Sequence, residues 1–195
     1  MIGGRDATTN EIIIKRHMEP NDIVFHADIH GAPFVLVKTG GKKPPGQTMK
    51  ESAQLAASYS KAWRENLSSV SVYWVSPEQV SKTPPSGQYL VKGAFMIRGS
   101  KNYVRDVPLQ VAIGIKAEDE HLMVIGGPVD AVAKQAEACV KLVPGREKSG
   151  RLAKRVREIL AERSPEHLQK QVREIPLQRL QRFIPLSRGA LKRKR

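Results

Sequence analysis

The stretch DIVFHADIHGAPFVLVK, residues 22–38, sets the expected fold of this 195-residue chain. Its two ends, residues 22–27 and 33–38, are rich in Val, Ile and Phe, a composition typical of β-strands. His30-Gly31 lies between them and predicts the connecting turn. We therefore expect two consecutive strands in this part of the chain.

The flanking segments predict a mixed architecture. A helix is expected over residues 6–18 and a longer one over residues 48–66, where Thr48 and Glu51 form a candidate capping box. Small residues on one face of the longer helix allow close packing on a sheet: Ala53, Ala56, Ala57, Ser60 and Trp63. Further strands are expected over residues 70–75, 94–97, 109–116, 121–125 and 139–143, and a short helix over residues 128–137. The pattern predicts an α+β protein with a single mixed, mostly antiparallel sheet and a long helix packed on it.

Charge is distributed unevenly along the chain. Residues 141–195 hold 17 basic and 5 acidic residues, whereas residues 1–140 hold 16 basic and 14 acidic residues. We therefore expect a domain over residues 1–145, followed by a basic helical extension over residues 146–195. Its helices are expected at residues 149–163 and after Pro165 and Pro176, with a disordered tail from Leu191.

Such a basic extension favours a polyanionic partner, either nucleic acid or an anionic membrane surface. Membrane-bound basic helices carry a broad face of Trp, Phe and Leu, but residues 146–175 contain no aromatic residue. Nucleic acid is therefore the expected partner, and no membrane partner is expected.

The rest of the composition restricts the class of protein. The single cysteine, Cys139, excludes an intrachain disulfide and a Cys-based zinc cluster, and its apolar surroundings indicate a small buried side chain. No apolar run reaches the roughly 20 residues of a membrane span, and the N-terminal residues lack the pattern of a signal peptide. We expect a cytoplasmic protein without a cofactor.

The stretch SKTPPSGQYLVKGAFMIRGSKN, residues 81–102, places cations and turn-forming glycines on both sides of a short apolar strand. Pro84-Pro85 stiffens the loop after Lys82. The segment from Arg98 to Asn102 predicts a tight turn in which Arg98 and Lys101 offer donors to phosphate oxygens. Two ordinary basic surface loops are the alternative. We expect Lys82 and Arg98 to converge on one anion-binding surface.

His26, Asp28 and His30 alternate along an extended strand and would share one face. Two His and one carboxylate are the ligand content of an iron or manganese site. Metal sites usually draw their ligands from separate elements, and Gly31 indicates that the strand is already turning at His30. The favoured interpretation is a His and an Asp that hydrogen-bond each other and nearby backbone, with no metal.

Five segments together resemble one known family. They are IGGRDATTNEIIIKRHM (residues 2–18), HADIHGAPFVLVK (26–38), AASYSKAWRE (56–65), YWVSPEQVSKTPPSGQYLVKGAFMIRGSKNYV (73–104) and LQVAIGI (109–115). In this order and spacing they closely resemble the NFACT-R domain, the RNA-binding domain of the ribosome-quality-control tailing factors of the NEMF family. The resemblance is strongest over residues 1–116.

This resemblance implies a non-enzymatic RNA-binding domain that acts at stalled nascent-chain complexes. Its implied partners are rRNA of the large ribosomal subunit and tRNA. Full-length family members also have an NFACT-N domain, a helix-hairpin-helix module and a coiled coil, which are not among these 195 residues. The chain is therefore expected to be either a stand-alone product that works with a separately encoded NFACT-N and coiled-coil partner, or a piece of a longer protein.

The residues expected to contact the RNA backbone are Arg5, Lys38, Lys82, Arg98, Lys101 and Asn102. Among the aromatic residues, Tyr89 is the best candidate for an exposed stacking side chain, whereas Trp63 and Trp74 are expected to be buried. The extension is expected to add a salt-dependent contribution through Arg151, Lys154, Arg155 and Arg157.

Two other function classes remain open at this point. One is an RNA-processing or RNA-modifying enzyme, or an accessory subunit of one, that uses His26, Asp28 and His30 as acid-base or metal residues. The other is a protein-interaction adaptor whose basic extension anchors it to the ribosome. A pocket that gathers these three residues with Lys82 and Arg98 would favour the enzyme, and loss of all RNA affinity on deletion of residues 146–195 would favour the adaptor.

Overall fold

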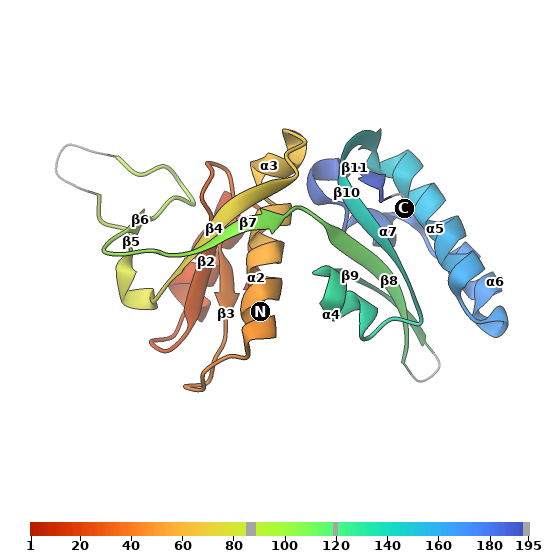
Figure 1. Cartoon of the computed structure of the whole chain (residues 1–195), viewed down its shortest axis with the longest axis horizontal. Coiled ribbons are helices and arrows are strands. Elements are labelled where there is room, and N and C mark those ends of the chain that lie inside the picture. The colour runs from red at the N-terminus through yellow and green to blue at the C-terminus, as the bar shows by residue number, and fades with distance from the viewer. Residues whose placement is uncertain (85–88, 119–120, 193–195) are drawn as a thin grey trace. The chain divides into compact units, whose positions relative to one another are not determined.

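The computed structural model describes residues 1–84, 89–118 and 121–192 (Figure 1). The chain divides into two compact units, of which unit 1 comprises Met1–Lys61 and Ser69–Pro108, and unit 2 comprises Ala62–Ser68 and Leu109–Arg195. Both units combine helices with antiparallel strands, which confirms the α+β class. The expected single sheet is wrong, because the described strands form three separate sheets.

Unit 1 contains a five-stranded sheet in the order β1-β3-β2-β4-β7 and a two-stranded ribbon, β5-β6. The strands are β1 (Ile2–Gly3), β2 (Ile23–Ala27), β3 (Val35–Val37), β4 (Ser69–Val75), β5 (Val80–Ser81), β6 (Met96–Ile97) and β7 (Asn102–Pro108). The helices are α1 (Ala7–Ile12), the π-helix η1 (Ile13–His17), α2 (Gly46–Ser58), α3 (Lys61–Arg64), which runs on into unit 2, and the 3-10 helix η2 (Pro77–Gln79).

The alternation of side chains in β2 gives the five-stranded sheet two different faces. Helix α2 packs on one face, where its buried Ala53, Ala56 and Ala57 allow a close approach to β2, β3, β4 and β7. Val24 points to the other face and joins a core that also includes Ile13 and Ile14 of η1. The ribbon contributes Val80 and Ile97 to this second core, and Phe95, just before β6, packs there too. The second face is therefore covered by η1 and the ribbon.

The long helix expected over residues 48–66 is interrupted. Helix α2 ends at Ser58, and the hydroxyl of Ser60 donates to the carbonyl of Ala57 at 2.6 Å, so the side chain satisfies a backbone group that a continuing helix would use. The helix also begins two residues before Thr48, at Gly46, with no side-chain cap. The expected capping box between Thr48 and Glu51 is therefore not formed.

Unit 2 contains a four-stranded antiparallel sheet in the order β11-β10-β8-β9. The strands are β8 (Val111–Glu118), β9 (His121–Gly127), β10 (Ala138–Lys148) and β11 (Arg188–Leu191). The helices are α4 (Val129–Ala133), α5 (Ser149–Arg163), α6 (Glu166–Glu174), α7 (Leu177–Gln181) and the 3-10 helix η3 (Pro185–Ser187).

Helices cover this sheet from both sides. Val129 and Val132 of α4 pack on Ala112 of β8, and Gly114 permits this approach because a Cβ there would lie 2.9 Å from Cγ1 of Val132. Helix α5 packs on β8, β10 and β11 and in turn carries α6 and α7 (Figure 1). The helices expected over residues 149–163 and after Pro165 and Pro176 are confirmed.

The division between the units differs from the boundary expected at residue 145. Residue 145 lies inside β10, and the basic helix α5 packs its buried Leu152, Val156 and Leu160 on the sheet that contains β10. A charge change marks surface composition, whereas a compact unit is defined by its shared core. The tail expected from Leu191 is also corrected at its start, because Leu191 pairs with Leu142 and the Lys192 amide donates to the Lys141 carbonyl at 3.0 Å. Residues 193–195 lie outside the described part.

Candidate nucleic-acid interface

Five rings follow one another across unit 1, and we call them the aromatic row: Phe95, Phe34, His26, Tyr73 and Tyr103. Their centroids are 5.5, 4.7, 5.7 and 6.0 Å apart in this order. The last two rings are opposite each other in the β4–β7 register. The row begins in the segment before β6 and ends on β7, the edge strand of the sheet. It therefore passes from the core to a strand that is open to solvent.

Three cations lie over rings of this row. Lys82 Nζ is 4.7 Å from the centroid of Phe95, Lys101 Nζ is 4.1 Å from that of Tyr73, and the Arg105 guanidinium carbon is 4.3 Å from that of Tyr103. Each such contact contributes about 0.5–1 kcal/mol when it is exposed. Tyr73 is buried, and this burial raises the pKa of its hydroxyl to about 12. Tyr103 is 39% exposed, so the outer end of the row is the accessible part.

Asp28 is the acidic member of this surface. Its carboxylate accepts a hydrogen bond from the Tyr103 hydroxyl at 3.3 Å and lies 3.7 Å from Lys101 Nζ. Because Asp28 follows β2 directly and its amide donates to the Ser71 carbonyl at 2.8 Å, it stays beside the sheet. Asp28 therefore orients Tyr103 and Lys101 relative to each other.

The three residues of the candidate metal or acid-base site do not form a cluster. The His26 ring packs between Phe34 and Tyr73, and burial lowers its pKa from 6.5 to about 4. Asp28 is engaged with Tyr103 and Lys101 rather than with His26, and His30 lies exposed in the turn before Gly31. No group of three or more His, Cys, Asp or Glu side chains that could hold a metal occurs within residues 1–84, 89–118 and 121–192.

Lys82 directly follows β5 and Arg98 directly follows β6, but Lys82 is neutralised. Its ammonium donates to Glu11 Oε1 at 2.6 Å and to the Ala94 carbonyl at 3.1 Å. The hydrogen bond from Lys82 lowers the pKa of the Glu11 carboxyl. Gly93 adjoins the same contact with φ +79°, and a Cβ there would lie 2.5 Å from Ala7 Cα. Lys82 thus fixes the ribbon to α1.

Arg98 remains exposed and is held by its backbone. The Arg98 amide donates to the Gln79 carbonyl at 2.8 Å, and Gln79 Nε2 donates to the carbonyls of Arg98 and Ser100 at 2.7 and 2.8 Å. Its guanidinium donates to the Thr83 carbonyl at 3.4 Å. No acidic side chain pairs with Arg98 in the described part of the chain. Its charge is available to a ligand.

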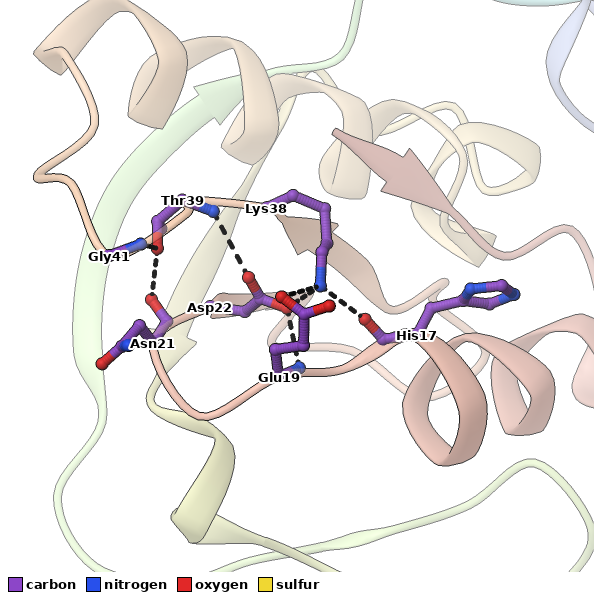
Figure 2. Close-up of polar contacts among 7 residues, drawn as sticks. All are labelled: His17, Glu19, Asn21, Asp22, Lys38, Thr39 and Gly41. Atoms are coloured by element: carbon purple, nitrogen blue, oxygen red, sulfur yellow. Dashed lines mark hydrogen bonds and ion pairs between the residues drawn. The ribbon is translucent and has the colours of Figure 1, made fainter.

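Lys38 belongs to a separate polar network, which Figure 2 shows. Its ammonium lies 2.7 Å from Asp22 Oδ2 and 3.0 Å from Glu19 Oε2, and it donates to the His17 carbonyl at 2.8 Å. Burial alone would raise the pKa of Asp22, but the hydrogen bonds from Lys38 and from the Glu19 and Thr39 amides hold it below its ordinary value. The position of Lys38 is therefore better explained by structure than by RNA contact.

The other predicted residues occupy varied environments. Arg5 is exposed and its backbone amide donates to Thr9 Oγ1 at 2.8 Å, while Asn102 Nδ2 donates to the Trp74 carbonyl at 3.4 Å. Tyr89 is 88% exposed, as expected. Trp63 is fully buried, also as expected, whereas Trp74 is only partly buried.

In unit 2, Arg151, Lys154 and Arg155 are exposed on α5. Arg155 pairs with Glu147 at 2.6 Å, and Arg157 donates to the Ile175 carbonyl at 3.2 Å. Only the first two of these four predicted cations are therefore without an acidic partner or a hydrogen bond among the residues described.

Tyr103 and Arg105 are candidate interface residues that the sequence reasoning missed. Both alternate with Asn102 and Val104 along β7, and this period of two was the available signal. Asp106, with φ +51°, accompanies the irregular register between β4 and β7 and obscures the pattern.

The comparisons with known proteins identify the family of the chain. The model of the family described as the NFACT protein RNA binding domain matches residues 1–99. The chain belongs to this family. In this NFACT RNA-binding domain, the matched residues include four rings of the aromatic row and Arg98, and Tyr103 and Arg105 follow shortly after.

Similar proteins come from archaea and animals. The archaeal Rqc2 homolog aRqcH of Methanocaldococcus jannaschii is 43% identical over 159 residues, which are 82% of this chain and 24% of that protein. The ribosome quality control complex subunit NEMF homolog of Drosophila melanogaster is 46% identical over 126 residues, or 63% of this chain and 12% of that protein. The human ribosome quality control complex subunit NEMF is 48% identical over 105 residues, which are 53% of this chain and 10% of that protein. The chain thus spans a quarter or less of the length of these relatives.

A solved structure, the C-terminal part of the fibronectin/fibrinogen-binding protein from Streptococcus suis, aligns with a TM-score of 0.45 and 24% identity. The alignment covers 55% of this chain and 40% of that one. Separately, no helix of the described residues has the length and apolar character needed to span a membrane.

Proposed function

We propose that unit 1 binds RNA at the outer end of the aromatic row, through Tyr103, Arg105, Lys101 and Arg98. The observation that carries this proposal is the exposed Tyr103 ring with the Arg105 guanidinium over it. Aromatic faces and guanidinium planes both stack on unpaired bases, and such stacking contributes about 1–3 kcal/mol per base. Arg98 adds an unpaired charge for phosphate oxygens. Unpaired RNA segments are the favoured ligand.

The RNA-binding proposal extends to the process in which the chain works. Its family is an RNA-binding one, and its archaeal and animal relatives are named as Rqc2 or NEMF proteins, the animal ones as subunits of a ribosome quality control complex. We infer that this chain acts in ribosome quality control, with large-subunit rRNA and tRNA as its RNA partners. Binding without catalysis is the proposed role, because the His26 ring packs between those of Phe34 and Tyr73 and does not form a cluster with His30 and Asp28.

The test uses the full chain with Tyr103→Ala and Arg105→Gln together. Fluorescence anisotropy with a labelled unstructured RNA oligonucleotide should show at least tenfold weaker binding, and co-sedimentation with large ribosomal subunits should fall in parallel. Lys50→Gln with Ser71→Ala is the matched control, since it removes one exposed charge on α2 and truncates one side chain of the sheet. Equal affinities of the interface variant and the control would refute the site. Loss of oligonucleotide binding with full retention on ribosomal subunits would refute the ribosomal role of this surface.

A further inference from the structure

Unit 2 carries a second charged surface, which we call the basic patch: Arg188, Lys148, Arg151 and Lys154. It lies outside residues 1–99, which the family model matches. All four side chains belong to exposed residues. Within residues 121–192 none of them has an ion pair, whereas the neighbouring Arg155 is paired with Glu147 at 2.6 Å. The patch therefore keeps its full positive charge.

The fold places these cations next to one another. Lys148 and Arg188 are directly opposite in the β10–β11 register, so their side chains leave the same face of the sheet. Lys148 is also the N-cap of α5, and Arg151 follows at the N3 position, on the same side of the first turn. Lys154 lies one turn further along the helix surface. The four residues thus form a continuous series from β11 to the middle of α5.

Two features of this arrangement are unfavourable for the isolated protein. Like charges directly opposite each other on antiparallel strands repel, and Lys148 and Arg188 have this relation. Cations near a helix N-terminus are disfavoured by the positive end of the helix dipole, yet the first turn of α5 has no acidic residue, carries Arg151 and is preceded by Lys148. An anion bound between these groups would relieve both kinds of repulsion.

The remaining surface of α5 argues against membrane insertion. Leu152, Val156 and Leu160 are all buried against the sheet, so the helix presents polar and charged side chains to solvent. A membrane-surface helix would expose an apolar face. A polymer with regularly spaced negative charges fits a series of unpaired cations better than a lipid surface does.

We propose that the basic patch is a second RNA-binding surface, which holds the sugar-phosphate backbone independently of the base-stacking surface of unit 1. It recognises charge and spacing rather than base sequence. Its contribution is therefore strongly dependent on salt, because each neutralised phosphate releases counterions.

The experiment compares two triple variants of the full chain. Lys148→Gln, Arg151→Gln and Arg188→Gln remove three charges of the patch, whereas Lys134→Gln, Lys141→Gln and Lys170→Gln remove three exposed charges elsewhere in unit 2. Binding to a labelled single-stranded RNA is measured between about 50 and 300 mM salt. The slope of log K against log salt is negative, and the patch variant should make it shallower by about 2. Each phosphate contact on a single strand contributes about 0.7 to the magnitude of this slope, and three contacts are removed. The control should leave the slope unchanged.

Equal slopes for the patch variant and the wild type, with both folded by circular dichroism, would overturn the inference. A reduction of equal size in the control would also overturn it, because net charge alone would then explain the effect. Flotation with phosphatidylserine vesicles then measures membrane binding by the same variants. If the patch variant loses vesicle binding without any loss of RNA binding, the patch binds membranes instead.

The result is separable from the proposal for unit 1. Tyr103→Ala should weaken RNA binding at every salt concentration with little change in slope, because stacking releases no counterions. A normal slope in the patch variant together with weak binding by Tyr103→Ala would reject only the basic patch. A reduced slope in the patch variant together with wild-type affinity in Tyr103→Ala would reject only the unit 1 surface.

Discussion

The two units use their cations in different ways. In unit 1, Lys82 is paired with Glu11, Lys38 with Asp22 and Glu19, and Lys101 with Asp28, so half of the six residues predicted to contact the RNA backbone also form ion pairs within the fold. In unit 2, the basic patch is unpaired among the residues described. The difference teaches that the partners of each cation, rather than a count of basic residues, decide how much charge is available to RNA.

The largest effect is expected from His26, which places a titratable ring in the core beside the interface. Its pKa is about 4 in the fold against an ordinary value of 6.5, so between these pH values the unfolded chain binds a proton that the folded chain does not. The stability contributed by neutral His26 is complete above pH 6.5 and falls by about 3 kcal/mol as the pH drops to about 4.

His26→Leu should abolish this part of the pH dependence. Urea unfolding at pH 7, 5.5 and 4 measures the effect, and the exposed His30→Gln variant is the control. If the Leu variant loses as much stability as the wild type over this window, another group is responsible and the ring is not held in its neutral form by burial.

A smaller loss of about 2 kcal/mol is expected from Asp22→Ala, which removes the acceptor of Lys38 and of two backbone amides. Its pKa is lowered in the fold, so this contribution is present above the ordinary value of 3.8 and is lost as the pH falls through the folded pKa. Thermal unfolding at pH 7 gives the size of the loss.

Glu19→Ala is the matched control for Asp22→Ala, because its exposed carboxylate also pairs with Lys38, and it should cost under about 1 kcal/mol. RNA affinity of folded Asp22→Ala should stay within twofold of the wild type. A tenfold loss of affinity would instead return Lys38 to the RNA interface and weaken the contrast between the units.

The smallest effect should have the opposite sign. Arg188→Glu replaces a like-charge pair across β10 and β11 with an opposite-charge pair and should stabilise the protein by about 0.5 kcal/mol. The same change should weaken RNA binding at low salt. Chemical denaturation and anisotropy on one preparation check both outcomes, and a variant that is less stable than Arg188→Gln would contradict the repulsion argument.

Local patterns predicted the elements whose signals are local. The Val and Ile runs of β2 and β3 and the apolar spacing of α5 suffice to identify them, because each buries one continuous set of side chains. Strand β7 was not predicted, because it is an edge strand and its exposed Arg105 and Asp106 interrupt the apolar pattern that marks a strand. The division of the strands among separate sheets was not predicted, since nothing in the sequence of a single strand indicates which sheet it joins.

The candidate site was predictable in part. The stretch around Arg98 and the exposure of Tyr89 could be inferred from turn chemistry and composition. The neutralisation of Lys82 could not, because its partner Glu11 is 71 residues away and no local pattern links them. The resemblance to the family identified the ligand class but not which cations are free to meet it.

Trp63 has a consequence for how the chain can be divided. It lies in the short segment Ala62–Ser68, which belongs to unit 2 although unit 1 resumes at Ser69, and its indole nitrogen donates to the Arg188 carbonyl at 2.7 Å. A fragment that stops at Pro108 would retain Trp63 but lack the rest of unit 2, in whose core this side chain is buried. The indole ring would then be exposed to water. Limited proteolysis between the units should therefore yield a nicked but associated protein rather than a soluble N-terminal half, and expression of that half alone should favour aggregation.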